Sequence, residues 1–206
     1  MIFRREIMLT RRAFLRGTLA AVGGVALFPL TLFANEAGAE VQTQWTPPIH
    51  KRFLQFTEYE DRPGTEFIVI HHTGFPGADT DSTATDIHKY HQETNGWAGI
   101  GYHYLIRKDG MIEQGRRPPV IGAHAYQHNR TSVGVCLAGN FDIGKPTAAQ
   151  MDAIKELIAW LCLKYQLDPM KKGVIVGHRD LNDTSCPGKN LYCRLDEIRR
   201  AAAKAQ

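Results

Sequence analysis

The pattern of apolar and polar positions divides the chain into short strand-like runs separated by turns. Residues 67–73 (FIVIHHT) form a β-branched apolar run that predicts a buried strand. Residues 132–139 (SVGVCLAG) and 173–178 (GVIVGH) predict two further buried strands. Residues 101–115 predict two strands joined through Asp109-Gly110, because Asp-Gly is a strong hairpin signal.

Helical patterns occupy three other segments. Residues 83–96 predict a helix that ends at Gly96 and has His88 and His91 on its surface. Residues 147–167 predict a longer helix, which begins at a capping box and continues with apolar residues at helical spacing. Residues 195–205 predict a closing helix. Strands that alternate with helices indicate one α/β domain with a mixed central sheet flanked by helices.

Residues 1–39 have a different character and predict an export signal. Arg11 and Arg12 stand before an apolar run, and the small residues 37–39 (AGA) offer a cleavage site. Paired arginines followed by Phe-Leu are typical of a twin-arginine signal. An uncleaved membrane anchor is the alternative, but two glycines and a proline interrupt the run and argue against a permanent span.

We therefore expect export through the twin-arginine machinery to the periplasm or another extracytoplasmic location. Residues 40–65 are expected to form an extended lead-in, and residues 66–206 the folded domain. The full chain has a formal charge of +4, but residues 1–39 contain five arginines and two glutamates. The remainder keeps 20 basic and 19 acidic residues, a charge of +1, so the composition does not predict nucleic-acid binding.

Metal-binding residue types follow two of the predicted strands. His71 ends one strand, His178 ends another, and Cys186 comes eight positions later. A thiolate with two imidazoles suits zinc, and three protein ligands leave a position for water or substrate, as in catalytic sites. The alternative is that the histidines hydrogen-bond loops and the cysteine forms a disulfide. Spacing alone leaves both interpretations open.

The other cysteines leave the disulfide pattern open as well. Cys136 lies in an apolar run and is expected to be an inert core thiol. If Cys186 binds a metal, at most one disulfide forms, and Cys162 with Cys193 is a possible pair.

Four sequence motifs resemble those of a known family. In chain order they are IVIHHT, GWAGIGYHYLIRKDG, IGAHAYQHNRTSVGVCLAGNF and VGHRDLNDTSCPGKNLY. They resemble the peptidoglycan recognition protein and amidase-type phage lysozyme family, from Phe67 to the C-terminus. The resemblance implies one Zn²⁺ per chain, held by His71, His178 and Cys186. Cell-wall recycling amidases are similar but have Asp at the cysteine position.

The resemblance also implies two catalytic residues. Tyr102 matches a tyrosine that assists catalysis beside the metal, and Thr184 matches a position that is Thr in active recognition proteins and Lys in phage enzymes. Either hydroxyl suits donation to a carbonyl oxygen that gains charge. Their structural alternatives are a core-edge tyrosine and a loop-capping threonine. Strand alternation predicts Tyr102 and Tyr104 on one face, His103 on the other, and His72 turned away from the metal.

Four residues are candidates for substrate binding. His124 and Asn129 match motif positions near the family's groove, although Asn129 also suits a turn. Trp97 suits the wall of a groove for sugar or peptide, or a packing anchor. In receptor relatives, Gly-Trp at this position accompanies a preference for diaminopimelate-type stems. Arg116 is the candidate for the extra carboxylate of such stems, with a solvated surface charge as the alternative.

Together these features predict an exported zinc amidase. It would hydrolyse the amide bond between N-acetylmuramic acid and L-alanine in peptidoglycan or a muropeptide. One rival is a receptor that binds peptidoglycan without cutting it. A second rival is a zinc peptidase that cuts within the stem peptide.

Overall fold

The computed structural model describes residues 45–205. The predicted export signal at residues 1–39 lies outside the described residues and stays a prediction. Among the described residues, no helix has both the length and the apolar character that crossing a bilayer requires.

The described residues form a six-stranded sheet in the order β1-β4-β3-β5-β2-β6. Only β3 and β4 are antiparallel to each other, and they form the predicted hairpin. The other neighbouring pairs are parallel, so the sheet is mixed, as predicted. The strands are β1 (Ile49–Lys51), β2 (Phe67–His72), β3 (Tyr104–Ile106), β4 (Ile112–Gln114), β5 (Ser132–Leu137) and β6 (Ile175–Gly177).

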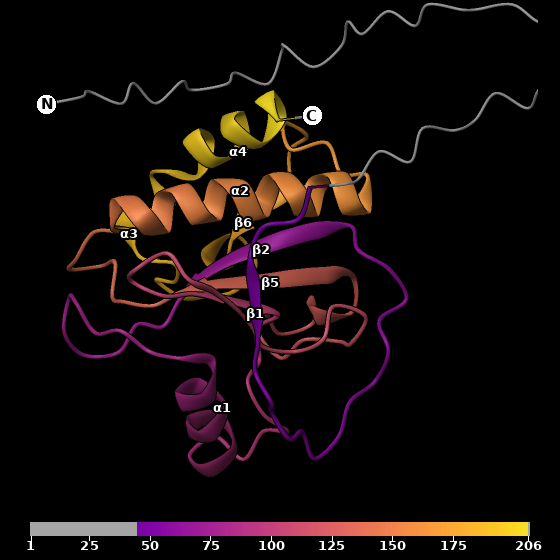
Figure 1. Ribbon diagram of the computed structural model, residues 1–206, viewed down its shortest axis with the longest axis vertical. Coiled ribbons are helices and arrows are strands. Elements are labelled where there is room, and N and C mark those ends of the chain that lie inside the picture. The colour runs from indigo at the N-terminus through magenta and orange to yellow at the C-terminus, as the bar shows by residue number, and fades with distance from the viewer. Residues whose placement is uncertain (1–44, 206) are drawn as a thin grey trace, which may run out of the picture. The chain divides into compact units, whose positions relative to one another are not determined.

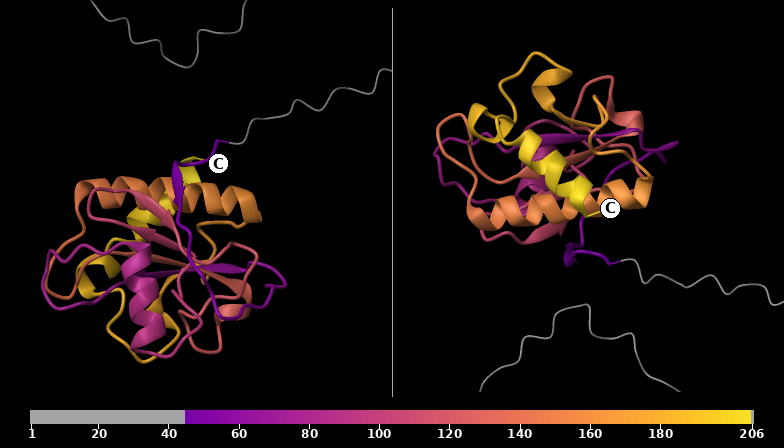
Figure 2. Two further views of the ribbon diagram at one scale, coloured as in Figure 1. Left: turned by 60° about the horizontal axis from the view of Figure 1, so that its bottom comes forward. Right: turned by 90° about the horizontal axis from the view of Figure 1, so that it is seen from above.

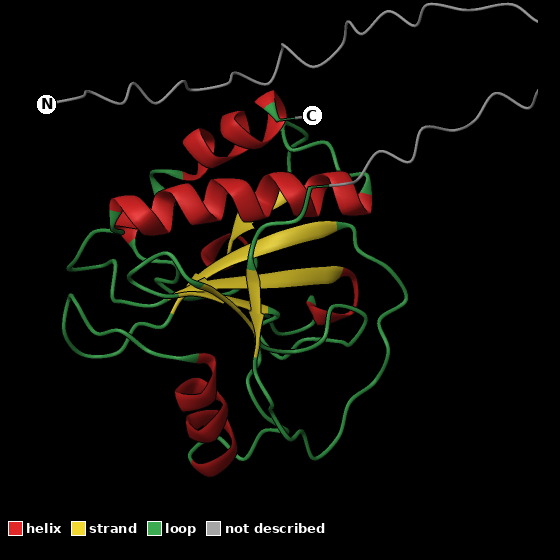
Figure 3. Ribbon diagram, viewed as in Figure 1, coloured by secondary structure: helices red, strands yellow, loops and turns green. Residues whose placement is uncertain are grey.

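Helices cover both faces of this sheet (Figures 1 and 3). Helix α2 (Ala148–Tyr165) lies on one face, with α4 (Leu195–Lys204) packed across it (Figure 2). Helix α1 (Ala84–Glu93) lies on the other face. The short helix α3 (Lys189–Tyr192) and the 3-10 turns η1 (Asn129–Thr131) and η2 (His178–Asp180) complete the fold.

Local sequence explains where helices α1 and α2 begin and end. Thr147 caps α2 through the predicted box with Gln150, and Thr83 caps α1 in the same way with Asp86. Helix α1 ends at Glu93, three residues before Gly96. Helix α2 ends at Tyr165, and its C-cap residue Gln166 takes the left-handed conformation that glycine favours at helix ends.

Two apolar cores lie on opposite faces of the sheet. The larger lies under α2 and α4 and contains Ile68, Ile70 and Tyr104. The smaller lies under α1 and contains Leu105 and Cys136, the latter fully buried as predicted. Alternate residues of β3 and β5 supply the two cores, as strand geometry requires.

Two predictions about side-chain direction are wrong. Tyr104 points into the larger core, whereas Tyr102 packs against the smaller one, so the two tyrosines do not share a face. The cause is that β3 begins only at Tyr104, so period-two alternation does not extend back to Tyr102. His88 and His91 are each only 7% exposed because they continue the buried face of α1.

Parallel pairing brings the ends of two strands together. β2 and β6 lie side by side, with Ile70 opposite Gly177. The next residues, His71 and His178, therefore lie at the same edge of the sheet. This edge is where open α/β sheets build their sites.

Candidate metal centre

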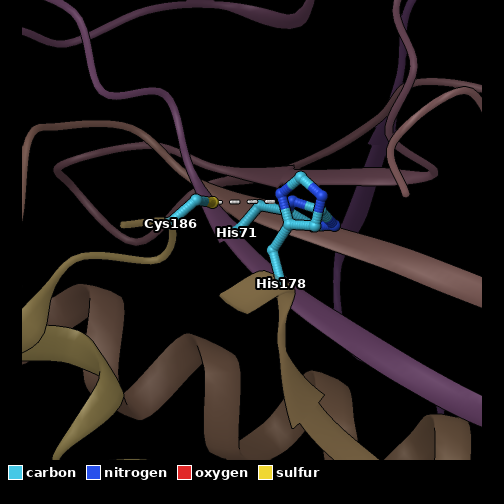
Figure 4. A group of neighbouring side chains, drawn as sticks. All are labelled: His71, His178 and Cys186. Atoms are coloured by element: carbon cyan, nitrogen blue, oxygen red, sulfur yellow. Dashed lines mark hydrogen bonds between the residues drawn. The ribbon is translucent and has the colours of Figure 1, made fainter. Parts of the chain in front are cut away.

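Three predicted ligands converge at this sheet edge. His71 comes from the end of β2, His178 begins η2 directly after β6, and Cys186 lies on the loop before α3. Figure 4 shows the three side chains pointing toward one another, with a dashed line between Cys186 and His71. Their ligand atoms all lie within 4.8 Å of one another. Among the described residues, this is the group of His, Cys and acidic side chains with metal-binding geometry.

The spacing of these atoms suits a small tetrahedral ion. Cys186 Sγ lies 3.6 Å from His71 Nδ1. Zinc binds sulfur at about 2.3 Å and nitrogen at about 2.0–2.1 Å, so two such ligands in a tetrahedral site lie roughly 3.5 Å apart. The donor set therefore fits zinc in chemistry, and the Cys186–His71 pair fits it in distance.

Burial tunes the protonation of the ligands. It lowers the pKa of His71 well below 6.5, and neighbouring His178 lowers it further, so this imidazole stays neutral and able to bind a metal. Burial likewise raises the pKa of the Cys186 thiol to about 12. The backbone N–H of His72 opposes that shift by donating to Cys186 Sγ at 3.4 Å. A thiolate here thus needs a nearby cation, and a bound metal ion provides one.

His72 turns away from the ligands, as strand alternation predicts. Its Nδ1 accepts a hydrogen bond of 3.1 Å from the backbone N–H of Phe141, on the side of the larger core. This bond ties the end of β2 to the loop at Phe141. The loop at Phe141 also holds the loop that carries Cys186, because Asp142 accepts a hydrogen bond of 2.7 Å from Ser185.

Tyr102 lies beside the ligands. Its ring centroid is 5.1 Å from that of His71. Burial raises the pKa of the phenol well above 10, and Cys136 and Cys186 add to the effect. Tyr102 is therefore a neutral donor at the edge of the centre.

Thr184 lies two residues before Cys186 and is half-buried. Its Oγ1 accepts a hydrogen bond of 3.2 Å from the backbone N–H of Cys186. The structure thus places Thr184 as a loop cap next to a ligand, and its catalytic role stays a prediction.

His124 and Asn129 belong to one turn behind the ligands. His124 Nδ1 lies 3.1 Å from His71 Nε2, and burial lowers the pKa of His124 well below 6.5. Asn129 Oδ1 accepts hydrogen bonds from the backbone N–H groups of His124 and Ala125, at 2.8 and 2.9 Å. Asn129 therefore closes the turn, and substrate contact by either residue stays a prediction.

Trp97 and Arg116 line one cleft of about 510 Å³, together with Glu58 and Glu60. Trp97 is 43% exposed. Arg116 is only 6% exposed, so it is not a solvated surface charge. Its guanidinium donates to the carbonyls of Ile100 and Ile121, at 2.8 and 3.0 Å, and Arg116 is one of the residues that line the cleft.

Sequence reasoning missed two residues that shape the centre. His91 lies between Trp97 and Tyr102, with ring centroids 4.7 and 5.7 Å away. The spacing of Ala84, Ile87, His88 and His91 is that of one buried helix face and was a usable signal. Asn182 accepts from His178 at 3.1 Å, and no comparable pattern identified it.

The structure pairs no cysteines among the described residues. Cys162 is buried on α2, Cys193 is exposed at the end of α3, and both are free thiols.

Comparison with known proteins decides the family. The family model described as N-acetylmuramoyl-L-alanine amidase matches residues 60–189, which include all three candidate ligands. The chain belongs to the N-acetylmuramoyl-L-alanine amidase family. This assignment agrees with the fold and with the resemblance of the four motifs.

Relatives come from animals, phages and bacteria. Peptidoglycan-recognition protein LB of Drosophila melanogaster is 39% identical over 63% of this chain, which spans 57% of the fly protein's length. The endolysin of Klebsiella phage KP32 is 36% identical over 67% of this chain and 88% of its own. The solved amidase LysC from Clostridium intestinale URNW has a TM-score of 0.67 and 33% identity, covering 75% of this chain and 97% of its own. This structural match confirms the predicted fold class.

Proposed function

We propose that this amidase-family protein is a zinc-dependent N-acetylmuramoyl-L-alanine amidase. It hydrolyses the amide bond between N-acetylmuramic acid and L-alanine in peptidoglycan or muropeptides. The observation that carries the proposal is the complete set of His71, His178 and Cys186, with Tyr102 beside it. Three protein ligands are typical of catalytic zinc, whereas structural zinc has four.

In the proposed reaction, the bound metal, Tyr102 and the cleft have separate roles. Bound zinc supplies Lewis acidity, which polarises a carbonyl and lowers the pKa of water. Tyr102, kept protonated by burial, donates its O–H to the carbonyl oxygen as negative charge develops there. The cleft lined by Trp97 and Arg116 orients the stem peptide, since an aromatic face and a guanidinium suit peptide and carboxylate groups.

The test is mass spectrometry of muropeptides after incubation with the protein. We expect the wild type to release a stem peptide with an intact N-terminal L-alanine, and a chelator to stop the reaction until zinc is restored. Cys186→Ser should abolish release, because a hydroxyl is a poor substitute for the thiolate ligand. Tyr102→Phe should slow release roughly 10²- to 10³-fold, the usual cost of losing one donor to an oxyanion.

Cys193→Ser is the matched control, since Cys193 is exposed and lies outside the ligand set. It should keep wild-type activity. Full activity of Cys186→Ser would contradict the metal site. Shorter peptides would instead indicate a peptidase that cuts within the stem.

A receptor that binds without cutting is the second candidate. It is favoured by the similarity to a protein named for peptidoglycan recognition. Muropeptide binding with no cleavage by the zinc-loaded wild type would support it.

A further inference from the structure

A turn behind the metal centre holds one histidine in a fixed slot. The ring of His124 lies between Gly122 and Gly134, and the side chain is 7% exposed. A Cβ added to Gly122 would lie 2.4 Å from His124 Cδ2, and one added to Gly134 would lie 2.5 Å from the same atom. Only glycine therefore leaves room for the ring at these two positions.

In this position between Gly122 and Gly134, the ring of His124 faces the candidate ligand His71. His71 turns Nδ1 toward Cys186 Sγ, at 3.6 Å, and a metal ion bound there would leave Nε2 to carry the ring proton. His71 Nε2 lies 3.1 Å from His124 Nδ1, so with Nδ1 on a metal the Nε2–H would donate to His124. Behind it, His124 Nε2 lies 3.5 Å from Ser132 Oγ, which donates to the carbonyl of His128 at 2.6 Å.

The second histidine ligand is held from outside in the same manner. His178 Nε2 donates to Asn182 Oδ1 at 3.1 Å, which leaves Nδ1 for the metal. Asn182 Nδ2 in turn donates to the backbone carbonyl of Tyr126 at 3.3 Å. The turn 124–129, closed by Asn129, therefore reaches both histidines, one directly and one through Asn182.

We propose that His124 and Asn182 are positioning residues that hold His71 and His178 with Nδ1 toward the metal, and that the turn 124–129 couples the two. This inference rests on the proposed zinc site and assigns a residue expected to bind substrate to the support of a ligand. Outer partners of this kind fix the tautomer and orientation of a ligand imidazole. Because one turn supports both imidazoles, their relative placement is set before a metal binds.

The test is the affinity of the folded, full-length chain for Zn²⁺, measured by competition with a chelator. His124→Leu fills the slot without an acceptor, and we expect it to weaken zinc binding roughly 10- to 100-fold. His124→Asn places an amide oxygen near the position of Nδ1 and should restore most of the affinity. Tyr126→Ala is the matched control, because Tyr126 is 76% exposed and contributes only its backbone carbonyl to Asn182.

Asn182→Leu provides a second variant on a surface loop, where a loss of folding is not expected. It should weaken zinc binding about 10-fold, while Asn182→Asp, which keeps an acceptor, should not. Long-range ¹H–¹⁵N spectra of the zinc-loaded wild type report the ring atoms directly. We expect a protonated Nε2 and a metal-bound Nδ1 for both His71 and His178.

The outcomes separate this inference from the proposed function. A wild type that binds no zinc overturns the zinc site and the positioning role together. Zinc binding through Nε2, or wild-type affinity in both His124→Leu and Asn182→Leu, overturns the positioning role and leaves the metal site intact.

Discussion

Two histidines on α1 hold the backbone that leads into Tyr102. His88 Nδ1 accepts from the backbone N–H of Ile100 at 3.2 Å, and His91 Nδ1 accepts from that of Gly101 at 3.0 Å. Both imidazoles must be unprotonated at Nδ1 to accept these bonds. Burial lowers the pKa of His91 to about 4, and Arg116 and His88 add to the effect. His91 therefore helps to place Tyr102 while it remains neutral.

This arrangement predicts that the free energy of unfolding falls at acidic pH, in part because of His91. Between pH 6.5 and about 4, the unfolded chain protonates His91 and the folded chain does not, so stability falls as the pH is lowered through this window. His91→Asn keeps an acceptor near Nδ1 but does not titrate. The slope of its unfolding free energy against pH should therefore be shallower than that of the wild type, by up to about 1.4 kcal/mol per pH unit.

Urea unfolding at several pH values in this window measures the slope. Thr85→Ala is the control, because it changes an exposed residue of α1 that does not titrate and should keep the wild-type slope. Equal slopes for His91→Asn and the wild type would show that His91 is protonated alike in both states.

At the residue scale, the sequence indicates which side chains meet at the candidate metal centre better than it indicates the partners that hold them. The order of residues along β2 and β6 places His71 and His178 at the end of a strand, and the eight-residue spacing places Cys186 on the loop that follows. The partners of these residues come from turns whose geometry depends on tertiary contacts. The contact of His124 with His71 spans 53 positions and requires two glycines to leave space. No local sequence pattern predicts such a contact.

At the scale of elements, one buried carboxylate joins three of them. Glu113 on β4 is fully buried and accepts two hydrogen bonds from Arg52, which follows β1. It also accepts a bond of 2.6 Å from the backbone N–H of Ala84, the first residue of α1. A negative charge at a helix N-terminus is favourable, so Glu113 fixes the start of α1 as well as the end of β1.

Removal of Arg52 should destabilise the fold. Arg52→Ala leaves a buried carboxylate without its cation, a change that costs about 3–5 kcal/mol for a fully buried pair. Since the Arg52 side chain is 38% exposed, solvent screens part of this effect and we expect a loss of about 2 kcal/mol. Chemical denaturation measures it, with the exposed neighbour Lys51→Ala as a control that changes stability by roughly 0.5 kcal/mol or less. Equal stability of the two variants would contradict this role of the ion pair.

Elements with strong local signals were predictable, and those set by the sheet were not. The capping box and apolar spacing of α2, and the Asp-Gly turn between β3 and β4, act within a few residues. By contrast, β1 lies in the segment expected as an extended lead-in and has no alternating apolar pattern. Its parallel pairing with β4 is imposed by the free edge of that strand and by the contact of Arg52 with Glu113. The short elements η1 and α3 likewise form in segments with turn-like sequences.

At the scale of the whole molecule, the candidate metal centre and the larger core lie in different places. The core between the sheet and α2 and α4 contains none of the three ligands. The ligands come from the ends of β2 and β6 and from the loop before α3, so a metal ion would join neighbouring segments of a sheet that is already packed. Folding should therefore not require the metal, in contrast to small domains whose core is a zinc site.

This separation predicts how the protein responds to zinc removal. A ligand that binds only the folded state at 100 times its Kd adds about 2.7 kcal/mol of stability. For a domain of this size, each kcal/mol shifts Tm by about 2–4 °C, so saturating zinc should raise Tm by roughly 5–10 °C. The chelated protein should keep its far-UV circular dichroism, because α2 and α4 pack without the site. Thermal melts with chelator and with added zinc measure both quantities. Cys186→Ser should melt like the chelated wild type in either condition, whereas collapse of the helical signal on chelation would mean that the metal holds the core together.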